Sequence, residues 1–201
     1  MEIIFIRHGQ GEHTLQPPAS LNTVDPSLTE YGICQARQLS IRYRLTKDDL
    51  IIASPTRRTI QTALYWKDHT ECPVLLHVAV GPRMFPLLPV SQAFPCDTSL
   101  SKLQLQNEFP NLRIYESAYT SWDAGINAID EALFSQVAHQ FIEWCLGWNK
   151  ERIYIVSHDG TITSYRTFLG EASLTRKDFL GETGSYCIQI TCDSKINRNR
   201  L

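Results

Sequence analysis

The sequence of 201 residues lacks the features that mark several large classes of protein. Neither charge is in strong excess, because the net charge is −2, and this disfavours nucleic acid and anionic membrane surfaces as partners. No apolar run approaches the roughly 20 residues that a membrane-spanning helix needs. The apolar segment at residues 3–6 is too short for a signal-peptide core and follows an acidic residue, so we expect a cytoplasmic protein.

Cysteine is present without the spacing that metal sites and redox motifs use. No two of the 6 cysteines form a Cys-x-x-Cys pair, and no cluster of His and Cys predicts zinc. We therefore expect buried, reduced thiols, no metal and no cofactor. No heptad pattern or exposed apolar stripe predicts an oligomeric state. The length favours one domain over residues 1–192, followed by a polar tail at residues 193–201.

What the sequence does contain is an alternation of strand and helix patterns. This alternation predicts an α/β fold with a largely parallel central sheet. Thr29 and Ser54 are expected to cap helices, and Pro55 after Ser54 suits a first helical position. The predicted strands cover residues 2–6, 49–53, 73–78, 152–156 and 186–191, and the predicted helices cover residues 30–45, 55–66, 127–148 and 161–169.

A proline-rich segment interrupts this alternation between residues 81 and 99. Its four prolines forbid a long regular element there. A loop of this length in a compact domain is typical of a lid over a site. We expect residues 79–126 to form a substrate loop and a cap insertion.

Basic side chains and histidines follow several of the predicted strands. Arg7 and His8 come directly after the first strand, Arg58 follows the second, and His158 follows the strand that ends at residue 156. In parallel sheets, ligands bind beyond the carboxyl ends of the strands. These four side chains would repel one another without an acidic partner, so we infer that they bind an anion such as a phosphate group.

Phosphoryl transfer fits these residue types. Arginine matches phosphate oxygens with two parallel hydrogen bonds, and a neutral imidazole is a competent nucleophile that forms a covalent intermediate. A second histidine stabilises charge on the transferred group. Gly9 and Gly11 are expected to let the backbone approach the anion and donate N–H groups to it.

Four segments resemble, in order, the motifs of the histidine phosphatase superfamily, the phosphoglycerate-mutase-like enzymes. The resemblance implies a three-layer α/β/α fold and a phosphomonoesterase that hydrolyses a small phosphorylated substrate through a phosphohistidine, without a metal or cofactor. The segments are Arg-His-Gly-Gln at residues 7–10, D-x-x-L-T-x-x-G-x-x-Q-A at residues 25–36, S-P-x-x-R-x-x-Q-T-A at residues 54–63, and Val-Ser-His-Asp-Gly at residues 156–160.

The resemblance also implies roles for single residues. His8 matches the nucleophile, His158 matches its partner across the phosphate, and Arg7 matches one clamp. The second clamp matches Arg58 and not Arg57, because the family's arginine stands four residues after the serine. Thr14 stands where many members carry an asparagine that touches phosphate. The implied substrate-binding residues are Gly9, Gln10, Gly11, His13, Thr14 and Gly160.

The proton donor departs from the family pattern. Pro86, or Pro89 in another alignment, stands where the family carries a glutamate, and proline cannot transfer a proton. Another branch of the superfamily uses the aspartate of a His-Asp pair, so Asp159 is the candidate acid. The alternative for Asp159 is an acid that complements a helix N-terminus. Weaker candidates for the acid are Asp97, Glu12 and Glu108.

Two other functions remain open. A phosphoglycerate-type mutase is disfavoured, because the segment after Arg-His-Gly lacks the pattern of those enzymes. A phosphate-binding module without catalysis would explain the proline at the acid position, although such a module needs no nucleophile. We expect Arg57, Arg83 and Arg166 to be solvated or structural.

Overall fold

The structure is a computed structural model that describes residues 1–190 of the chain. The predicted polar tail at residues 193–201 lies outside the described residues. Six strands form one sheet in the order β4-β3-β2-β5-β1-β6. The strands are β1 (Glu2–Arg7), β2 (Leu50–Ala53), β3 (Val74–His77), β4 (Arg113–Tyr115), β5 (Arg152–Ser157) and β6 (Ser185–Gln189), and the helices are α1 (Glu30–Arg42), α2 (Arg57–Lys67), α3 (Lys102–Glu108), α4 (Glu131–Gly147) and α5 (Asp159–Phe168).

All strand pairs are parallel except the pair of β6 with β1. The central strand β5 pairs with β1 on one side and with β2 on the other. Four consecutive residues are buried in each of β1, β2 and β3, as parallel strands covered on both faces require. The expectation of an α/β fold with a mostly parallel sheet is confirmed.

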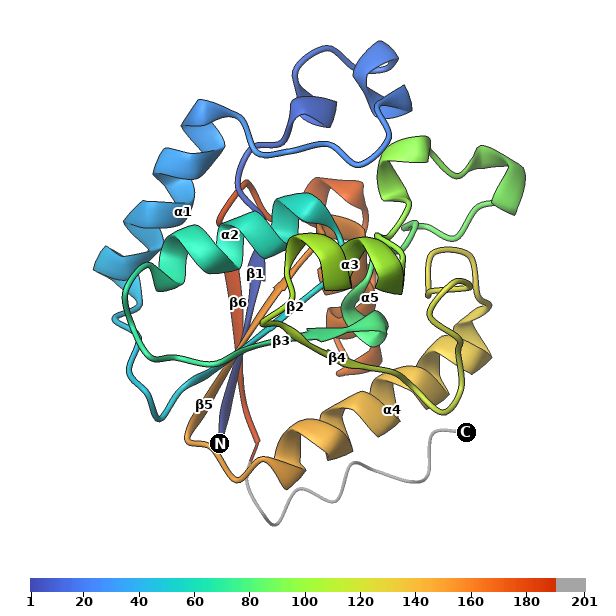
Figure 1. The fold of residues 1–201 in the computed structure, drawn as a ribbon. Helices are drawn as coiled ribbons and strands as arrows, with labels where there is room; N and C mark the ends of the chain where they lie inside the picture. The colour runs from blue at the N-terminus through green and yellow to red at the C-terminus, as the bar shows by residue number, and fades with distance from the viewer. Residues whose placement is uncertain (191–201) are drawn as a thin grey trace.

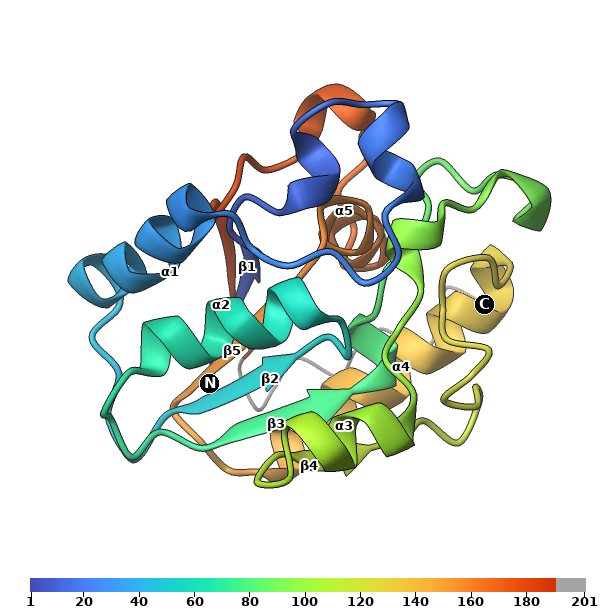
Figure 2. The ribbon, with the colours of Figure 1, turned by 45° about the horizontal axis from the view of Figure 1, so that its top comes forward.

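Alternate residues of β1 enter two separate cores. Ile3 and Phe5 belong to the core beneath α4 and α5, whereas Ile4 and Ile6 belong to the core beneath α1 and α2. This alternation follows from the two-residue repeat of a strand. The result is three layers, with α1 and α2 on one face of the sheet and α4 and α5 on the other (Figure 2).

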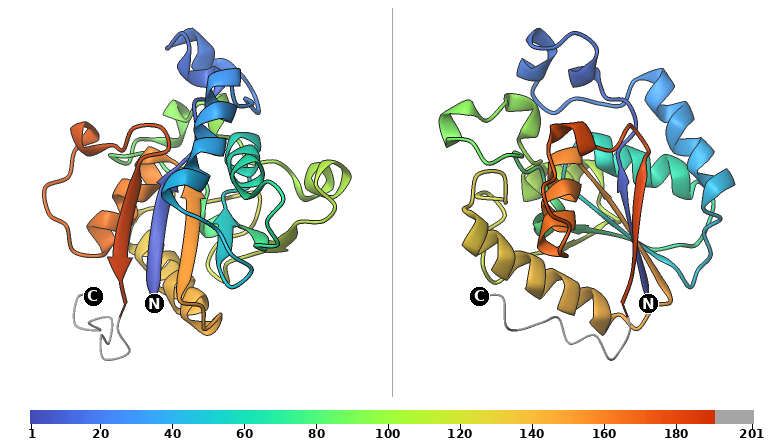
Figure 3. Two further views of the ribbon diagram at one scale, coloured as in Figure 1. Left: turned by 90° about the vertical axis from the view of Figure 1, so that its left-hand side faces the viewer. Right: turned by 180° about the vertical axis from the view of Figure 1, so that it is seen from behind.

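The carboxyl ends of the parallel strands meet at one edge of the sheet, at the top of Figure 1. The loop at residues 8–29, the loop at residues 81–99 and the start of α5 gather above this edge. The views in Figure 3, from the side and from behind, show the same gathering. The N-terminus lies at the opposite end of the sheet.

Side-chain caps decide where two of the helices begin. The Thr29 hydroxyl accepts a hydrogen bond from the Gly32 N–H at the start of α1, which confirms the predicted cap. Helix α4 begins at Glu131 and not at residue 127, because Asp130 caps it by accepting from the Leu133 N–H.

The predicted start of α2 is wrong. The helix begins at Arg57, and Thr56 precedes it without a side-chain cap, whereas Ser54 was expected to be the cap. The Ser54 hydroxyl lies beside a histidine instead.

Two elements between residues 100 and 116 were not predicted. Helix α3 begins with a capping box between Ser101 and Gln104. Strand β4 is only three residues long and pairs with β3 at the edge of the sheet. The segment at residues 79–126, expected to be a loop and cap, therefore also supplies one strand of the sheet.

The five helices within residues 1–190 are too short or too polar to span a bilayer.

Candidate active site

His8 lies immediately after β1, with 2% of its surface exposed. Its Nδ1 atom lies 2.7 Å from the carbonyl oxygen of Gly9. Because a carbonyl only accepts, Nδ1 carries the proton and donates it. The Nε2 atom therefore keeps its lone pair, and the Nε atom of Arg58 lies 3.3 Å from it.

The surroundings of His8 keep the imidazole neutral. Burial lowers its pKa well below the usual value of 6.5, and the charges of Arg58, His13 and Arg7 lower it further. A neutral imidazole with a lone pair at Nε2 is the form in which histidine acts as a nucleophile.

His158 lies between β5 and α5, and its ring centre is 5.2 Å from that of His8. Its Nδ1 atom accepts from the Nη2 atom of Arg58 at 3.1 Å, because a guanidinium only donates. The Nε2 atom then carries the proton and donates it to the Ser54 hydroxyl at 2.8 Å. Burial, followed by the charge of Arg58, lowers the pKa of His158 well below 6.5, so this ring is neutral too.

Arg58 stands in the first turn of α2 with 1% of its surface exposed. Besides contacting both histidines, it donates from Nη1 to the carbonyl oxygen of Cys96 at 2.7 Å. Its Nη2 atom lies 3.2 Å from Oδ1 of Asp97. One guanidinium therefore joins His8, His158 and the loop at residues 81–99.

Thr62 joins the loop after β1 to α2. It lies one helical turn beyond Arg58, and its hydroxyl donates to the carbonyl oxygen of Arg58 at 2.7 Å. The same hydroxyl accepts from the Gly9 N–H at 3.1 Å. The Gly9 N–H was expected to face the anion, and this hydrogen bond to Thr62 corrects that expectation.

Arg57 points away from the histidines, although it adjoins Arg58 in the sequence. Its Nε atom lies 2.7 Å from Asp25, and its Nη1 atom lies 2.6 Å from Glu108. Glu108, a weak candidate for the proton donor, is therefore held in a partly exposed ion pair with Arg57.

Arg7 is held by two contacts and keeps one free donor. Its Nη2 atom lies 3.0 Å from Oδ2 of Asp159, and its Nη1 atom donates to the carbonyl oxygen of Leu180 at 2.6 Å. Its Nε atom is buried and has no hydrogen-bond partner within residues 1–190. An anion beside His8 would satisfy this donor.

The expectation that these cations meet without an acidic partner is wrong. Asp159 pairs with Arg7, and Asp97 pairs with Arg58. Asp159 follows His158 at the end of β5, so its presence near the site could be anticipated from the sequence. Asp97 lies in the loop at residues 81–99, and its pairing with Arg58 could not be anticipated. The case for an anion now rests on the free donor of Arg7 and on the neutral histidines.

Asp159 begins α5, and both of its carboxylate oxygens have partners. Oδ2 faces Arg7, and Oδ1 accepts from the Gly160 N–H at 2.7 Å. This position agrees with the alternative interpretation, an acid at a helix N-terminus. A role in proton donation would require Asp159 to release one of these donors.

His13 is brought to the site by a short 3-10 turn at Glu12–Thr14. Its ring centre lies 5.4 Å from that of His8, and burial lowers its pKa to about 3. Its Nδ1 atom is buried and has no partner among the described residues. This neutral ring is therefore available to a substrate.

The other predicted contacts serve the loop itself. The Thr14 hydroxyl donates to the carbonyl oxygen of Gly11 at 2.8 Å. The side chain of Gln10 accepts from the Thr29 hydroxyl at 2.9 Å, at the start of α1. Glu12, another weak candidate for the acid, accepts from the Ser27 N–H at 3.0 Å.

Close approaches of the backbone explain two of the predicted glycines. A Cβ atom at Gly9 would lie 2.6 Å from the carbonyl oxygen of Gly32, and one at Gly160 would lie 2.2 Å from that of Arg83. A Cβ atom at Gly11 would instead meet the His13 ring at 2.6 Å. These glycines shape the site.

Arg83 and Arg166 are structural, as expected. Arg83 donates to the carbonyl oxygens of Ile126 and Ile129 and pairs with Glu131. Arg166 pairs with Glu171 at 2.8 Å.

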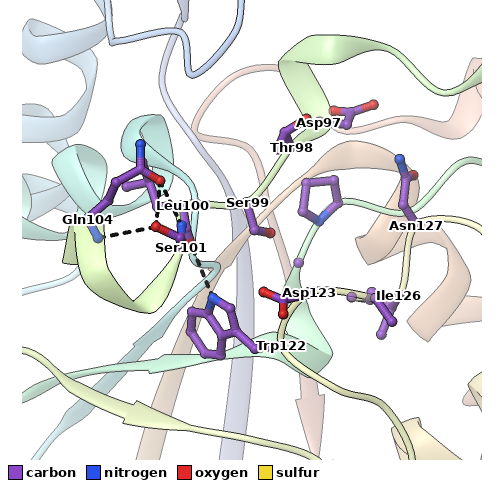
Figure 4. Close-up of a pocket in the computed structure, with 14 residues that line it drawn as sticks. Asp97, Thr98, Ser99, Leu100, Ser101, Gln104, Trp122, Asp123, Ile126 and Asn127 are labelled. Atoms are coloured by element: carbon purple, nitrogen blue, oxygen red, sulfur yellow. Dashed lines mark hydrogen bonds between the residues drawn. The ribbon is translucent and has the colours of Figure 1, made fainter. Parts of the chain in front are cut away.

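A cavity of about 370 Å³ adjoins the site (Figure 4). Asp97 and Thr98 lie at one side of it, and Trp122 and Asp123 lie at the other. The lining residues include two carboxylates and several amides and hydroxyls, and none of them is a lysine or an arginine.

No group of three His, Cys, Asp or Glu residues within residues 1–190 could hold a metal ion. The positive charge at the site comes from Arg7 and Arg58.

Sequence reasoning missed two residues that touch the predicted site. Ser54 contacts His158, and the signal for it was present, because Ser54 directly follows a strand that ends at the same sheet edge. Thr62 lies one turn after Arg58 in the same motif, so helical spacing could have indicated it.

Comparisons with known proteins agree with this geometry. Residues 3–80 match the family described as histidine phosphatase superfamily (branch 1). A search of curated proteins gives no match. The predicted resemblance is confirmed, with the sequence match covering the segments that hold His8 and Arg58.

Solved structures resemble the chain over nearly its whole length. A putative α-ribazole-5′-P phosphatase from Escherichia coli has a TM-score of 0.61 and 18% identity, covering 96% of this chain and 91% of that one. The ecdysone phosphate phosphatase from Bombix mori, in complex with tungstate, has a TM-score of 0.68 and 13% identity, covering 94% and 88%. A phosphoserine phosphatase mutant from Entamoeba histolytica, in complex with phosphoserine, has a TM-score of 0.59 and 21% identity, covering 92% and 89%. At these identities the likeness shows the fold.

Proposed function

We propose that this chain, whose residues 3–80 match the histidine phosphatase superfamily (branch 1), is a phosphomonoesterase that works through a phosphohistidine at His8. The observation that carries the proposal is the pair of neutral imidazoles with ring centres 5.2 Å apart, joined by the buried guanidinium of Arg58. The substrate is a small phosphorylated molecule.

The first step transfers the phosphoryl group to His8. The Nε2 lone pair attacks phosphorus, and the bond from phosphorus to the ester oxygen breaks. Arg58 and the free Nε–H of Arg7 donate to the phosphoryl oxygens. His158 is expected to contact the phosphoryl group from the side opposite His8. The Nδ1–H of His8 donates to Gly9 throughout, which directs the reacting nitrogen at the substrate.

The second step returns His8 to its starting state. Water attacks the phosphohistidine, the bond between nitrogen and phosphorus breaks, and inorganic phosphate leaves. Arg7 and Arg58 supply the positive charge for both steps, so the proposed reaction needs no metal ion.

The cavity favours a phosphatase over a phosphoglycerate-type mutase. A phosphoglycerate carries a carboxylate beside its phosphate, and carboxyl groups that line the cavity would repel this second negative charge. The cavity beside the site is lined by Asp97 and Asp123 without a lysine or an arginine. A neutral or positively charged leaving group suits this lining better.

A binding module without catalysis is less well supported. Such a module needs the clamp alone, whereas His8 has its lone pair at Nε2 and a pKa that keeps it neutral. The proline at the usual acid position is compatible with catalysis if another acid supplies the proton.

The test compares the wild type with His8→Ala on p-nitrophenyl phosphate in EDTA, from pH 4.5 to 8. We expect the wild type to release phosphate and the variant to lose at least about 10³-fold in kcat, since no other nucleophile replaces His8. The matched control is His69→Ala, because the side chain of His69 is 97% exposed and outside the site. Equal activity of the wild type and His8→Ala would refute the proposal, and loss of activity in EDTA would refute its metal independence.

Trapping supplies a second readout. Acid-labile, base-stable labelling by ³²P-labelled substrate that is absent in His8→Ala would identify the phosphohistidine. Release of an isomeric ester in place of inorganic phosphate would identify a mutase.

A further inference from the structure

The proposed reaction leaves one proton unassigned. An alkoxide leaves poorly unless it is protonated as the bond to phosphorus breaks. Pro86 and Pro89 occupy the positions where a glutamate would be expected. We propose that Asp97, on the 3-10 turn Pro95–Asp97, donates this proton to the leaving oxygen, an inference that rests on the proposed function.

Arg58 places Asp97 at the reaction centre. The guanidinium donates to the carbonyl oxygen of Cys96 and lies 3.2 Å from Oδ1 of Asp97, so it fixes the turn at two points. The same Nη2 atom lies 3.1 Å from Nδ1 of His158. The Nη2 atom of Arg58 therefore contacts both Asp97 and His158, and this places Asp97 next to the position where phosphate is expected.

The two oxygens of Asp97 differ in a way that suits an acid. Oδ1 accepts from Arg58 and lies 3.9 Å from Sγ of Cys96, whereas no hydrogen bond within residues 1–190 ends on Oδ2, which is free to carry a proton. Both oxygens of Asp159 are engaged, one by Arg7 and the other by the Gly160 N–H. Of the two aspartates, Asp97 can therefore be protonated without breaking an existing hydrogen bond.

Its surroundings favour the protonated form of Asp97. Burial raises the pKa of this carboxyl above its usual value of 3.8, although the charge of Arg58 opposes the rise. The negative charge of Asp159 adds to the rise. A bound phosphate ester would add further negative charge next to the carboxyl and raise the pKa again. Substrate binding thus favours the protonated form of Asp97, which is the form that can act as an acid.

The cavity lies where a leaving group would have to be. Asp97 contacts Arg58 and is also one of the residues that line the 370 Å³ cavity (Figure 4). An ester whose phosphate lies against Arg58 and whose organic part enters this cavity would pass its bridging oxygen close to Asp97.

Asp97 gives up a proton in the first step and regains one in the second. As the bond from phosphorus to the ester oxygen breaks, the electron pair goes to that oxygen, which takes the proton from Oδ2 and leaves as a neutral alcohol. Asp97 is now a carboxylate. In the second step it accepts a proton from the attacking water, which restores the acid for the next cycle.

The test uses two aryl phosphates with different leaving groups, phenyl phosphate and p-nitrophenyl phosphate. The value of kcat/KM reports the first step for both. We expect Asp97→Asn to lower kcat/KM by about 10²-fold on phenyl phosphate and by less than about 10-fold on p-nitrophenyl phosphate, because the better leaving group needs little protonation. On phenyl phosphate we also expect the activity of the wild type to decline toward high pH, as Asp97 loses its proton, and the activity of Asp97→Asn not to show this decline.

The matched control is Asp159→Asn, which also removes the carboxylate partner of an arginine at the site. We expect it to lower kcat/KM by a similar factor on both substrates. Equal losses on the two substrates in Asp97→Asn, or a loss selective for phenyl phosphate in Asp159→Asn, would overturn the assignment. A wild type without activity, or an active His8→Ala, would instead refute the proposed function. Circular dichroism of both variants establishes that they are folded.

Discussion

The hydroxyl of Ser54 lies 2.8 Å from Nε2 of His158, and this contact determines which nitrogen of the ring carries the proton. With Nε2–H directed at Ser54, Nδ1 is left to accept from Arg58. Both groups of the pair are buried. The structure thus assigns Ser54 the positioning of His158, although Ser54 was expected to cap α2.

We expect Ser54→Ala to lower kcat about 10-fold and the free energy of unfolding by about 1 kcal/mol, because it leaves Nε2–H without its buried acceptor. Steady-state kinetics and urea unfolding measure the two effects. The control is Ser164→Ala, which removes a buried hydroxyl that bonds only the carbonyl oxygen of Gly160 within its own helix. If both variants lose kcat equally, the contact with His158 has no special role.

The neighbours Arg57 and Arg58 should differ sharply in their effect on activity. Arg58→Lys removes the guanidinium that contacts both histidines, and we expect kcat/KM to fall by about 10²–10³-fold. Arg57→Lys disturbs two partly exposed ion pairs, so we expect activity within about 3-fold of wild type and a stability loss under about 1 kcal/mol. A larger loss of activity in Arg57→Lys than in Arg58→Lys would contradict the placement of the phosphate clamp at Arg58.

Gly160→Ala should disturb the start of α5. The new Cβ atom would lie 2.2 Å from the carbonyl oxygen of Arg83, so one backbone must move. We expect a loss of about 1–3 kcal/mol in the free energy of unfolding and weaker activity, because His158 precedes this turn. Gly147→Ala, at the end of α4, meets no atom within 4 Å and is expected to gain about 0.5–1 kcal/mol. Thermal unfolding of the two variants checks both signs.

The stability of the protein should fall in mild acid, and His77 is one of the buried histidines that contribute to the fall. Burial lowers its pKa to about 4, against 6.5 in an unfolded chain. Below pH 6.5 the unfolded state therefore binds a proton that the folded state does not, and the stability is lost progressively down to pH 4. We expect His77 to contribute about 3 kcal/mol to this loss.

The variant His77→Asn tests this contribution. Its side-chain oxygen replaces Nδ1 as the acceptor for the Ala79 N–H, and it does not titrate. Urea unfolding at pH 7 and pH 4.5 should show a smaller difference between the two pH values than in the wild type. His69→Asn, at a fully exposed site, should leave the difference unchanged.

Much of the fold follows from local patterns, and the exceptions have physical causes. Strands β1, β2 and β5 are short apolar runs that are buried on both faces, so their composition reveals them. Strand β4 has three residues and is half-buried at the edge of the sheet, and it has no such signature. The start of α2 was misplaced because serine followed by proline suits a helix cap, whereas Ser54 forms a hydrogen bond with His158.

Some residues of the site also follow from the sequence, and others do not. The residues expected at strand ends, among them His8 and His158, are brought together because parallel strands end at one edge of the sheet. The pairing of Asp97 with Arg58 depends on the path of the loop at residues 81–99, which has no periodic pattern from which it could be derived. For this reason the sequence favoured Asp159 over Asp97 as the acid.

The hydroxyl of Thr62 has a consequence for how this chain can change over evolutionary time. Arg58 and Thr62 are spaced one turn apart, and together they hold the loop that carries His8. A substitution on the outer face of α2 leaves both in place. An insertion or deletion between them would rotate one away from the other by about 100° per residue and detach two motifs at once. We therefore expect the outer face of α2 to tolerate changes of side chain, and the segment between Arg58 and Thr62 not to tolerate a change of length.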